Sequence, residues 1–256
     1  MTALRGNRFS RRAVLLAGLS TAVPVRASGF RSAKVVAVKR HGVLELESGR
    51  TVVMQHLRIP QIPAPFGFEA FAGLNDLLEG RDIIYLPSMD GADRFGNLRA
   101  SVWYPGDKTL LGDSIWERVV RQGLARIFAS GTYSGVVPEM WVLEAEARAA
   151  RHGLWAERAY DVRAADADRL AQDMETHQIV EGIVTDAQSR GSRTFLNFGS
   201  DYRTDFTVVV TDAIGKRLAE PSETLSGARV QVRGFIEMVN GPSLWLTHPD
   251  NLRILD

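Results

Sequence analysis

Side chains suited to acid–base or metal chemistry are few in this sequence. His41, His56 and Glu45 lie close together in the chain, and imidazole nitrogens and carboxylates are the ligands that zinc prefers. Residues 247–250 (THPD) offer a second histidine–aspartate pair. Histidines in loops and strands are more often structural, and His-Pro-Asp after a strand is typical of a turn, so we expect neither group to hold a metal. The sequence shows no serine–histidine–aspartate arrangement and no Gly-rich phosphate loop.

A second group of side chains, between residues 190 and 203, is suited to binding. Its members are Tyr202, Arg203, Arg190 and Arg193. Exposed aromatic rings stack on nucleobases and arginines attract phosphates, so the group could bind single-stranded nucleic acid, a polysaccharide or a peptide. Residues 170–256 carry 8 basic and 12 acidic side chains, so nucleic-acid binding requires the arginines to gather on one face. Phe195 and Phe206 lie in alternating strands and are expected in the core.

Composition sets limits on the class of protein. With 256 residues, 45% of them hydrophobic and 24% charged, the chain can form one large or two small globular domains. There is no cysteine, which excludes disulfides, thiolate metal sites and cysteine nucleophiles.

The N-terminal segment has the pattern of an export signal. Residues 1–27 contain five arginines and no acid. Within this segment, the basic residues up to Arg12 are followed by an apolar run from Ala13 to Val23, which is too short to span a membrane. The pair Arg11–Arg12 is typical of a twin-arginine signal, and a Sec signal is the alternative. We therefore expect an exported protein, periplasmic or extracellular, with no membrane span once the signal is removed. Without this segment 26 basic face 30 acidic side chains, a formal net charge of −4.

Alternating apolar and polar residues predict two β-rich units. Strands are expected at 34–38, 42–48, 51–57, 81–86 and 98–104, with helices at 66–80, 113–128 and 137–155. Further strands are expected at 178–188, 193–199, 205–211, 229–241 and 243–255. The fold predicted is mainly β with α, an α+β class. A small five-stranded OB-type barrel with three helices occupies residues 33–157, a linker 158–176, and a second OB-like barrel 177–256.

Three motifs in the first unit resemble the thermonuclease (staphylococcal-nuclease-like) family. They are DRFGNLRASVW at 93–103, VVRQGLARI at 119–127 and LEAEARAARHGLW at 143–155. The second unit is similar to the OB-like extension of some exported bacterial members. The resemblance implies calcium-assisted attack of water on a DNA or RNA phosphodiester, which needs carboxylates for the ion and the water and two arginines for the phosphate.

The positions where the resemblance places this catalytic machinery carry other residues. They are Arg40 and Gly42 in place of two acids, His56 and Asn97 in place of the two arginines, Gln61 in place of the metal aspartate and Ala64 in place of the water-positioning glutamate. The conserved frame without these groups predicts a pseudo-nuclease that acts as a binding or scaffold protein in the cell envelope. No cofactor is expected.

Two alternative functions remain open. Arg58 and Arg99 each lie two residues from a lost arginine, on the same strand face, so a divergent nuclease could use them with calcium and with Asp90 or Asp93. Asp93 is also expected simply to shape a turn. The other alternative is an OB protein that binds single-stranded nucleic acid without chemistry. The partner would then be nucleic acid, as opposed to an envelope protein or polymer.

Overall fold

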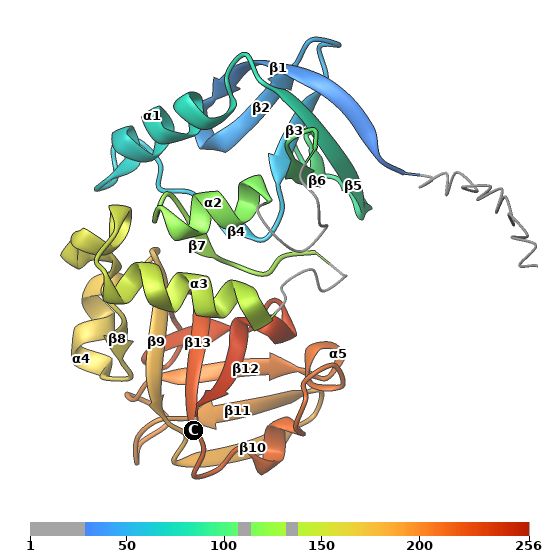
Figure 1. Ribbon diagram of the computed structural model, residues 1–256. Helices are drawn as coiled ribbons and strands as arrows, with labels where there is room; N and C mark the ends of the chain where they lie inside the picture. Colours follow the sequence, from blue (N-terminus) through green and yellow to red (C-terminus); the bar gives the residue numbers. More distant parts are fainter. Residues whose placement is uncertain (1–28, 107–113, 132–137, 256) are drawn as a thin grey trace, which may run out of the picture.

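The N-terminal half of the chain forms a closed five-stranded barrel, as the sequence predicts. The computed structural model describes residues 29–106, 114–131 and 138–255 (Figure 1). The strands follow the order β1-β2-β3-β6-β5 around the barrel, and β3 and β6 run parallel. Their bounds are β1 (Arg31–Lys39), β2 (Val43–Leu46), β3 (Thr51–Met54), β5 (Asp82–Ala92) and β6 (Leu98–Trp103).

The core of the closed barrel is filled by alternate side chains of its strands, which point inward. In β2 and β3, Leu44, Leu46 and Val52 are buried while their neighbours are half-exposed. Helix α1 (Gly67–Leu78) adds Leu74 and Leu78 to the same core, spaced one turn apart on one helix face.

The two helices that follow the barrel are shorter than the sequence predicts. Their bounds are α2 (Ile115–Arg121) and α3 (Pro138–Ala149). After α2 the chain turns at Gly123, where φ is +66° and an added Cβ would lie 2.1 Å from the His152 carbonyl oxygen. The segment beyond it forms β7 (Arg126–Ile127), antiparallel to β4 (Leu57–Arg58). The helix predicted at 113–128 was therefore wrong in its second half, because only glycine tolerates this turn.

The predicted helix at 137–155 also ends early. Arg151 and Gly153 both have positive φ, 51° and 55°, which breaks the helix after Ala149. The family-like residues Leu154 and Trp155 lie beyond this break in a short 3₁₀ turn and are almost fully buried. Helices α2 and α3 lie between the barrel and the second unit (Figure 1).

The second unit packs two sheets on one core. One sheet has the order β10-β11-β12-β15-β14 and the other β16-β13-β9-β8. The bounds are β8 (Arg163–Ala164), β9 (His177–Ile183), β10 (Asp186–Arg190), β11 (Arg193–Asn197), β12 (Thr207–Thr211), β13 (Arg229–Phe235), β14 (Glu237–Met238), β15 (Pro242–Trp245) and β16 (Leu252–Leu255), with helices α4 (Ala167–Leu170) and α5 (Asp212–Gly215). Leu196, Phe206, Val208 and Val232 are among the buried residues that both sheets share.

The strand order of the second unit repeats that of the barrel. β9 and β10 are separated by two residues and belong to different sheets. β10, β11 and β12 then pair in antiparallel order. β12 pairs in parallel with β15, as β3 does with β6. Among the described residues, a closed ring of paired strands is found only in the barrel. The second OB-like barrel therefore stays a prediction that the strand order favours.

Residues 158–176, which the sequence predicts as a linker, contribute structure to the second unit. β8 pairs in parallel with β9, and Leu170 of α4 is fully buried in the second core. Arg163 binds Asp173 at 2.7 Å across this segment. The segment therefore packs against the unit that follows it.

Buried polar contacts join the two units along β7. Arg233 of β13 is 2% exposed, and it donates to the Ile127 carbonyl at 2.8 Å and to Glu144 of α3 at 2.9 Å. Glu144 also accepts the Ile127 N–H at 2.7 Å. Asn251 binds both the N–H and the carbonyl of Ala129, at 2.8 and 2.9 Å. Because Arg233 and Asn251 of the second unit bind buried groups of the first, we expect these contacts to hold the units together.

Candidate functional site

The loop between β4 and α1 meets the turn between β1 and β2, as the predicted catalytic alignment requires. Arg40, Gly42, Gln61 and Ile62 line one cavity of about 60 Å³ with apolar side chains from α1. The lining contains no acidic side chain. Calcium takes six to eight oxygen ligands, mostly from carboxylates and carbonyls. One amide beside a guanidinium does not fit that ion, and the cavity is far smaller than a nucleotide.

His56 is not part of this cavity. Its side chain is 3% exposed, and its Nδ1 accepts the N–H of Ser130 at 3.4 Å. The ring lies 6.5 Å from that of His248, which is fully buried and accepts the N–H of Asp250. The residue at the position of the first family arginine is thus a packing residue between the two units.

The expected turn roles of Asp93 and residues 247–250 agree with the structure. Asp93 accepts the N–H groups of Phe95 and Asn97 at 2.8 and 2.9 Å and the Asn97 side chain at 3.0 Å. These hydrogen bonds lower the pKa of Asp93 against the opposing effect of its burial. His248 caps a 3₁₀ turn through Asp250. Among the described residues, no three acids or histidines are arranged to hold a metal ion.

The two proposed substitute arginines have different surroundings. Arg58 lies over the ring of Phe235 in the second unit, with 4.5 Å from its guanidinium carbon to the ring centre. Arg99 donates to the carbonyl of Ala92 at 3.3 Å on the barrel rim. Arg58 and Gln61 line one cavity, to which Arg99 does not contribute. Within the described residues, no hydrogen bond or ion pair joins the two arginines, so the geometry does not assemble a phosphate clamp from this pair.

Comparison with known proteins addresses the resemblance directly. Residues 49–157 match the family model described as staphylococcal nuclease homologue. The chain carries a thermonuclease-like domain. The match spans β3 to the buried turn at Trp155, and the turn at Arg40 lies before it. No curated protein matches the chain. The thermonuclease-like domain therefore has the family frame, and the loop at Gln61 and Ala64, where the resemblance places the metal aspartate and the water-positioning glutamate, carries no acid.

Outside the thermonuclease-like domain, the second unit presents a groove of aromatic and cationic side chains. Its volume is about 210 Å³, and its lining includes no acidic residue. We call it the aromatic groove, and its aromatic and cationic lining residues are Tyr202, Trp245, Phe195, Arg190 and Arg193. Arg193 lies over the Trp245 ring at 4.8 Å and Arg190 over the Tyr202 ring at 5.8 Å. Cation and ring surfaces thus lie together.

The aromatic groove brings together three of the four residues predicted to bind. Arg203, the fourth, lies over the outer side of this cluster at 5.4 Å from the Tyr202 ring centre. The expectation that Phe195 is a core residue was wrong, because β11 turns it toward the groove, whereas Phe206 is 1% exposed. Trp245 is one of the aromatic residues of this unit that the sequence offers for stacking, but it was not among the four residues predicted to bind. Only the pairing of β12 with both β11 and β15 brings it near Arg193.

We expect the folded protein to lose stability as the pH falls from about 6.5 to about 4. Burial, and secondarily His248, lowers the pKa of His56 to about 4, whereas the unfolded chain takes up this proton near pH 6.5. The contribution is therefore complete above pH 6.5 and lost as the pH falls through this window. Its upper bound is about 3.5 kcal/mol, because one pKa unit corresponds to about 1.4 kcal/mol.

Urea unfolding at several pH values measures this effect. His56→Asn should flatten the pH dependence, because it removes the imidazole that titrates. Asparagine is chosen because it tolerates the positive φ of this position. The matched control is His41→Asn, at an exposed position with similar φ, which should leave the slope unchanged. His177, whose pKa burial also lowers, keeps part of the slope. An unchanged slope in His56→Asn would contradict the assignment.

Proposed function

We propose that this protein is a thermonuclease-fold binding protein without phosphodiesterase activity, and that its aromatic groove binds single-stranded nucleic acid. The observation that carries the proposal is the groove itself. It joins Tyr202, Trp245 and Phe195 to Arg190 and Arg193 with no acid in its lining. Stacking surfaces beside cations suit successive bases and the phosphates between them.

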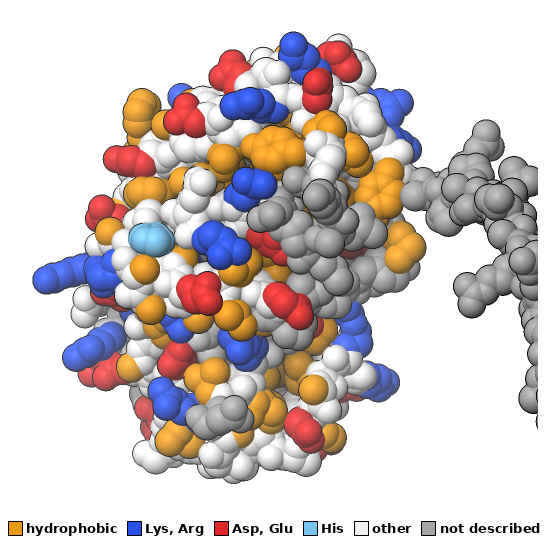
Figure 2. Space-filling view, in the orientation of Figure 1, with side chains coloured by type: hydrophobic (Ala, Val, Ile, Leu, Met, Phe, Trp, Pro, Cys, Tyr) orange, Lys and Arg blue, Asp and Glu red, His pale blue; other side chains and the backbone are white. Residues whose placement is uncertain are grey.

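The charge distribution supports a local site. On the face shown in Figure 2, acidic and basic side chains are interspersed, without a large area of one sign. A net-acidic unit can bind a nucleic acid only where its arginines gather. Arg190 and Arg203 lie over the Tyr202 ring, and Arg193 lies over Trp245 in the same groove. This arrangement favours nucleic acid over an envelope protein or polymer, which stays the alternative partner.

The loss of activity is supported by the loop at Gln61. A hydrolytic site for a phosphodiester needs carboxylates for the ion and for the water, and the cavity at this loop offers none. We also propose export to the periplasm or beyond, which the pattern of residues 1–27 supports; these residues lie outside the described structure. Among the helices of the described ranges, none is long and apolar enough to cross a membrane.

The loss of activity is tested by incubating the purified chain with single-stranded DNA and calcium. We expect intact DNA on a denaturing gel over hours. Calcium-dependent cleavage would overturn the proposal. If such cleavage disappears in the double variant Arg58→Ala, Arg99→Ala, the divergent nuclease is correct. Cleavage that persists in that variant would leave Arg58 and Arg99 without a catalytic role.

A further inference from the structure

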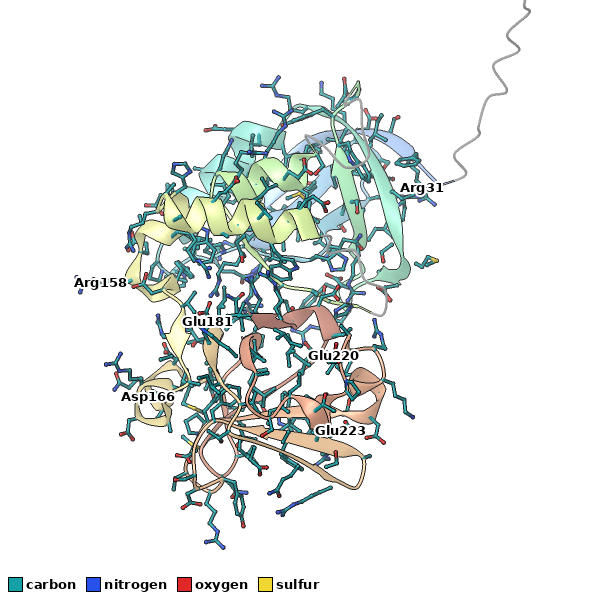
Figure 3. All side chains as sticks on the ribbon, turned by 60° about the horizontal axis from the view of Figure 1, so that its bottom comes forward. Arg31, Arg158, Asp166, Glu181, Glu220 and Glu223 are labelled. Carbon is teal, nitrogen blue, oxygen red and sulfur yellow. The ribbon has the colours of Figure 1, made fainter. Side chains whose placement is uncertain are left out.

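A pocket of about 370 Å³ opens at the junction of the two units, away from the aromatic groove. The thermonuclease-like domain contributes Arg58, Ala64 and Arg126 to its lining, and the second unit contributes His177, Gln178 and Phe235. Figure 3 shows side chains of both units in the space between them. We call this site the junction pocket. Its volume is that of a small-molecule site.

Three of the residues that line the junction pocket carry buried polar atoms without a hydrogen-bond partner. Arg126, His177 and Gln178 are 5%, 4% and 5% exposed. The Arg126 Nη2 donates to the His177 carbonyl at 2.9 Å, but its Nη1 has no partner. Both ring nitrogens of His177 and the Oε1 of Gln178 also lack one. An unpaired buried polar atom costs about 1–3 kcal/mol, so three such side chains at one cavity indicate that a ligand completes them.

The charge of the junction pocket selects an anion. Arg58 contacts the ring of Phe235, and no hydrogen bond or ion pair to an acid is described for Arg58 or Arg126. Asp173, which also lines the pocket, is bound to Arg163 at 2.7 Å, and Glu175 is exposed to solvent. Burial, with the field of Arg126 and Arg58, lowers the pKa of His177 well below its usual range. The interior therefore holds excess positive charge.

Ala64 is uncharged, so it does not neutralise the positive charge of the junction pocket. Ala64 is exposed and lines the pocket, and the family resemblance places a glutamate there. A carboxylate at this position would lie in the same cavity as the guanidinium groups of Arg58 and Arg126 and would oppose their positive charge. The loss of the family acid thus leaves a cationic cavity.

We propose that the junction pocket binds a small organic anion whose carboxylate or phosphate group lies between Arg58 and Arg126. The anion accepts hydrogen bonds from the unpaired Nη1 of Arg126 and from the Arg58 guanidinium. Its remainder carries a donor, such as a hydroxyl or amine, for the Gln178 Oε1, and an acceptor or donor for the ring of His177. Apolar parts of the ligand pack against Phe235 and the proline-rich loop before α1.

Isothermal titration of the purified chain tests the proposal, with inorganic phosphate and malate as separate probes. Chloride at the same ionic strength is the blank. We expect one saturable site per chain for at least one probe. Binding of phosphate alone identifies a phosphate ligand, and binding of malate alone identifies a carboxylate ligand. Either result supports the site. The absence of saturable binding of both probes would overturn it.

Substitutions at the exposed Ala64 and the half-buried Arg58 separate the junction pocket from adventitious binding. Ala64→Glu should abolish binding, and Arg58→Gln should weaken it by a factor on the order of ten or more, because a hydrogen bond to a charged group is lost. The matched control is Ala72→Glu, an equally exposed alanine on α1 outside the lining. Unchanged binding in Ala64→Glu would also overturn the proposal. None of these variants touches the aromatic groove, so the two sites can fail independently.

Discussion

Arg233→Met is expected to lower the free energy of unfolding by about 3–5 kcal/mol, the largest effect of any single polar substitution that we predict. The change leaves the carboxylate of Glu144, a residue 2% exposed, without its cation in the interior. It also removes the donor of the Ile127 carbonyl and the guanidinium that lies 4.2 Å from the Trp141 ring centre. Urea unfolding followed by tryptophan fluorescence measures the loss.

The control for this prediction lies on the same strand. Arg229→Met removes an exposed arginine that is 3.5 Å from Glu181, and exposed ion pairs contribute about 0–1 kcal/mol. The double variant Arg233→Met, Glu144→Leu should recover part of the loss, because an apolar pair replaces a lone buried charge. Recovery is incomplete since Glu144 also accepts the Ile127 N–H. Equal effects of the Arg233 and Arg229 variants would contradict the account of the junction.

Tyr202→Ala and Trp245→Ala are expected to weaken the binding of a single-stranded oligonucleotide by about 1–3 kcal/mol each, roughly 5- to 150-fold. Both rings line the aromatic groove, and Tyr202 is 48% exposed, so its removal should leave the fold intact. Arg193→Ala should lower the slope of log affinity against log salt by about 0.7, the loss of one phosphate contact on a single strand. Fluorescence anisotropy at several salt concentrations measures both effects.

Phe95→Ala provides the matched control for the groove. Phe95 is 73% exposed and carries an arginine, Arg94, 4.7 Å from its ring centre, but it lies on the barrel between β5 and β6. The pair has the same chemistry as Tyr202 with Arg190 in a different place. Equal weakening by Phe95→Ala, or an affinity that does not change with salt, would reject the groove as the nucleic-acid site.

The sequence predicted the barrel well because its short strands β2 and β3 alternate between buried and half-exposed residues. Val52 and Met54 point inward by period-two spacing, and the helix over α1 follows from Leu74 and Leu78. The two later helices were predicted too long, since the pattern does not reveal that Gly123 and Arg151 adopt positive φ. Backbone conformation at such points is decided by packing of distant segments, here by the close approach of His152 to Gly123.

The sites were predictable in part. Motif order placed Gln61 beside the turn at Arg40, and the structure brings them to one cavity. The junction was missed because Arg233 and Glu144 are 89 residues apart, and in β13 an arginine between apolar residues is typical of a solvent-facing side. Both faces of β13 are buried, which becomes visible only when α3 and β7 cover one of them. Buried polar contacts between two units cannot be predicted from the sequence pattern of one strand.

One measurement tests the central claim most directly: the anisotropy of an end-labelled single-stranded oligonucleotide mixed with the purified chain in calcium buffer and followed over hours. We predict an immediate rise that reverses on addition of salt, is reduced in Tyr202→Ala, and stays constant with time. A rise followed by a calcium-dependent decline to the value of free short fragments would contradict the claim that the protein binds without cleaving. The absence of any rise would contradict the groove.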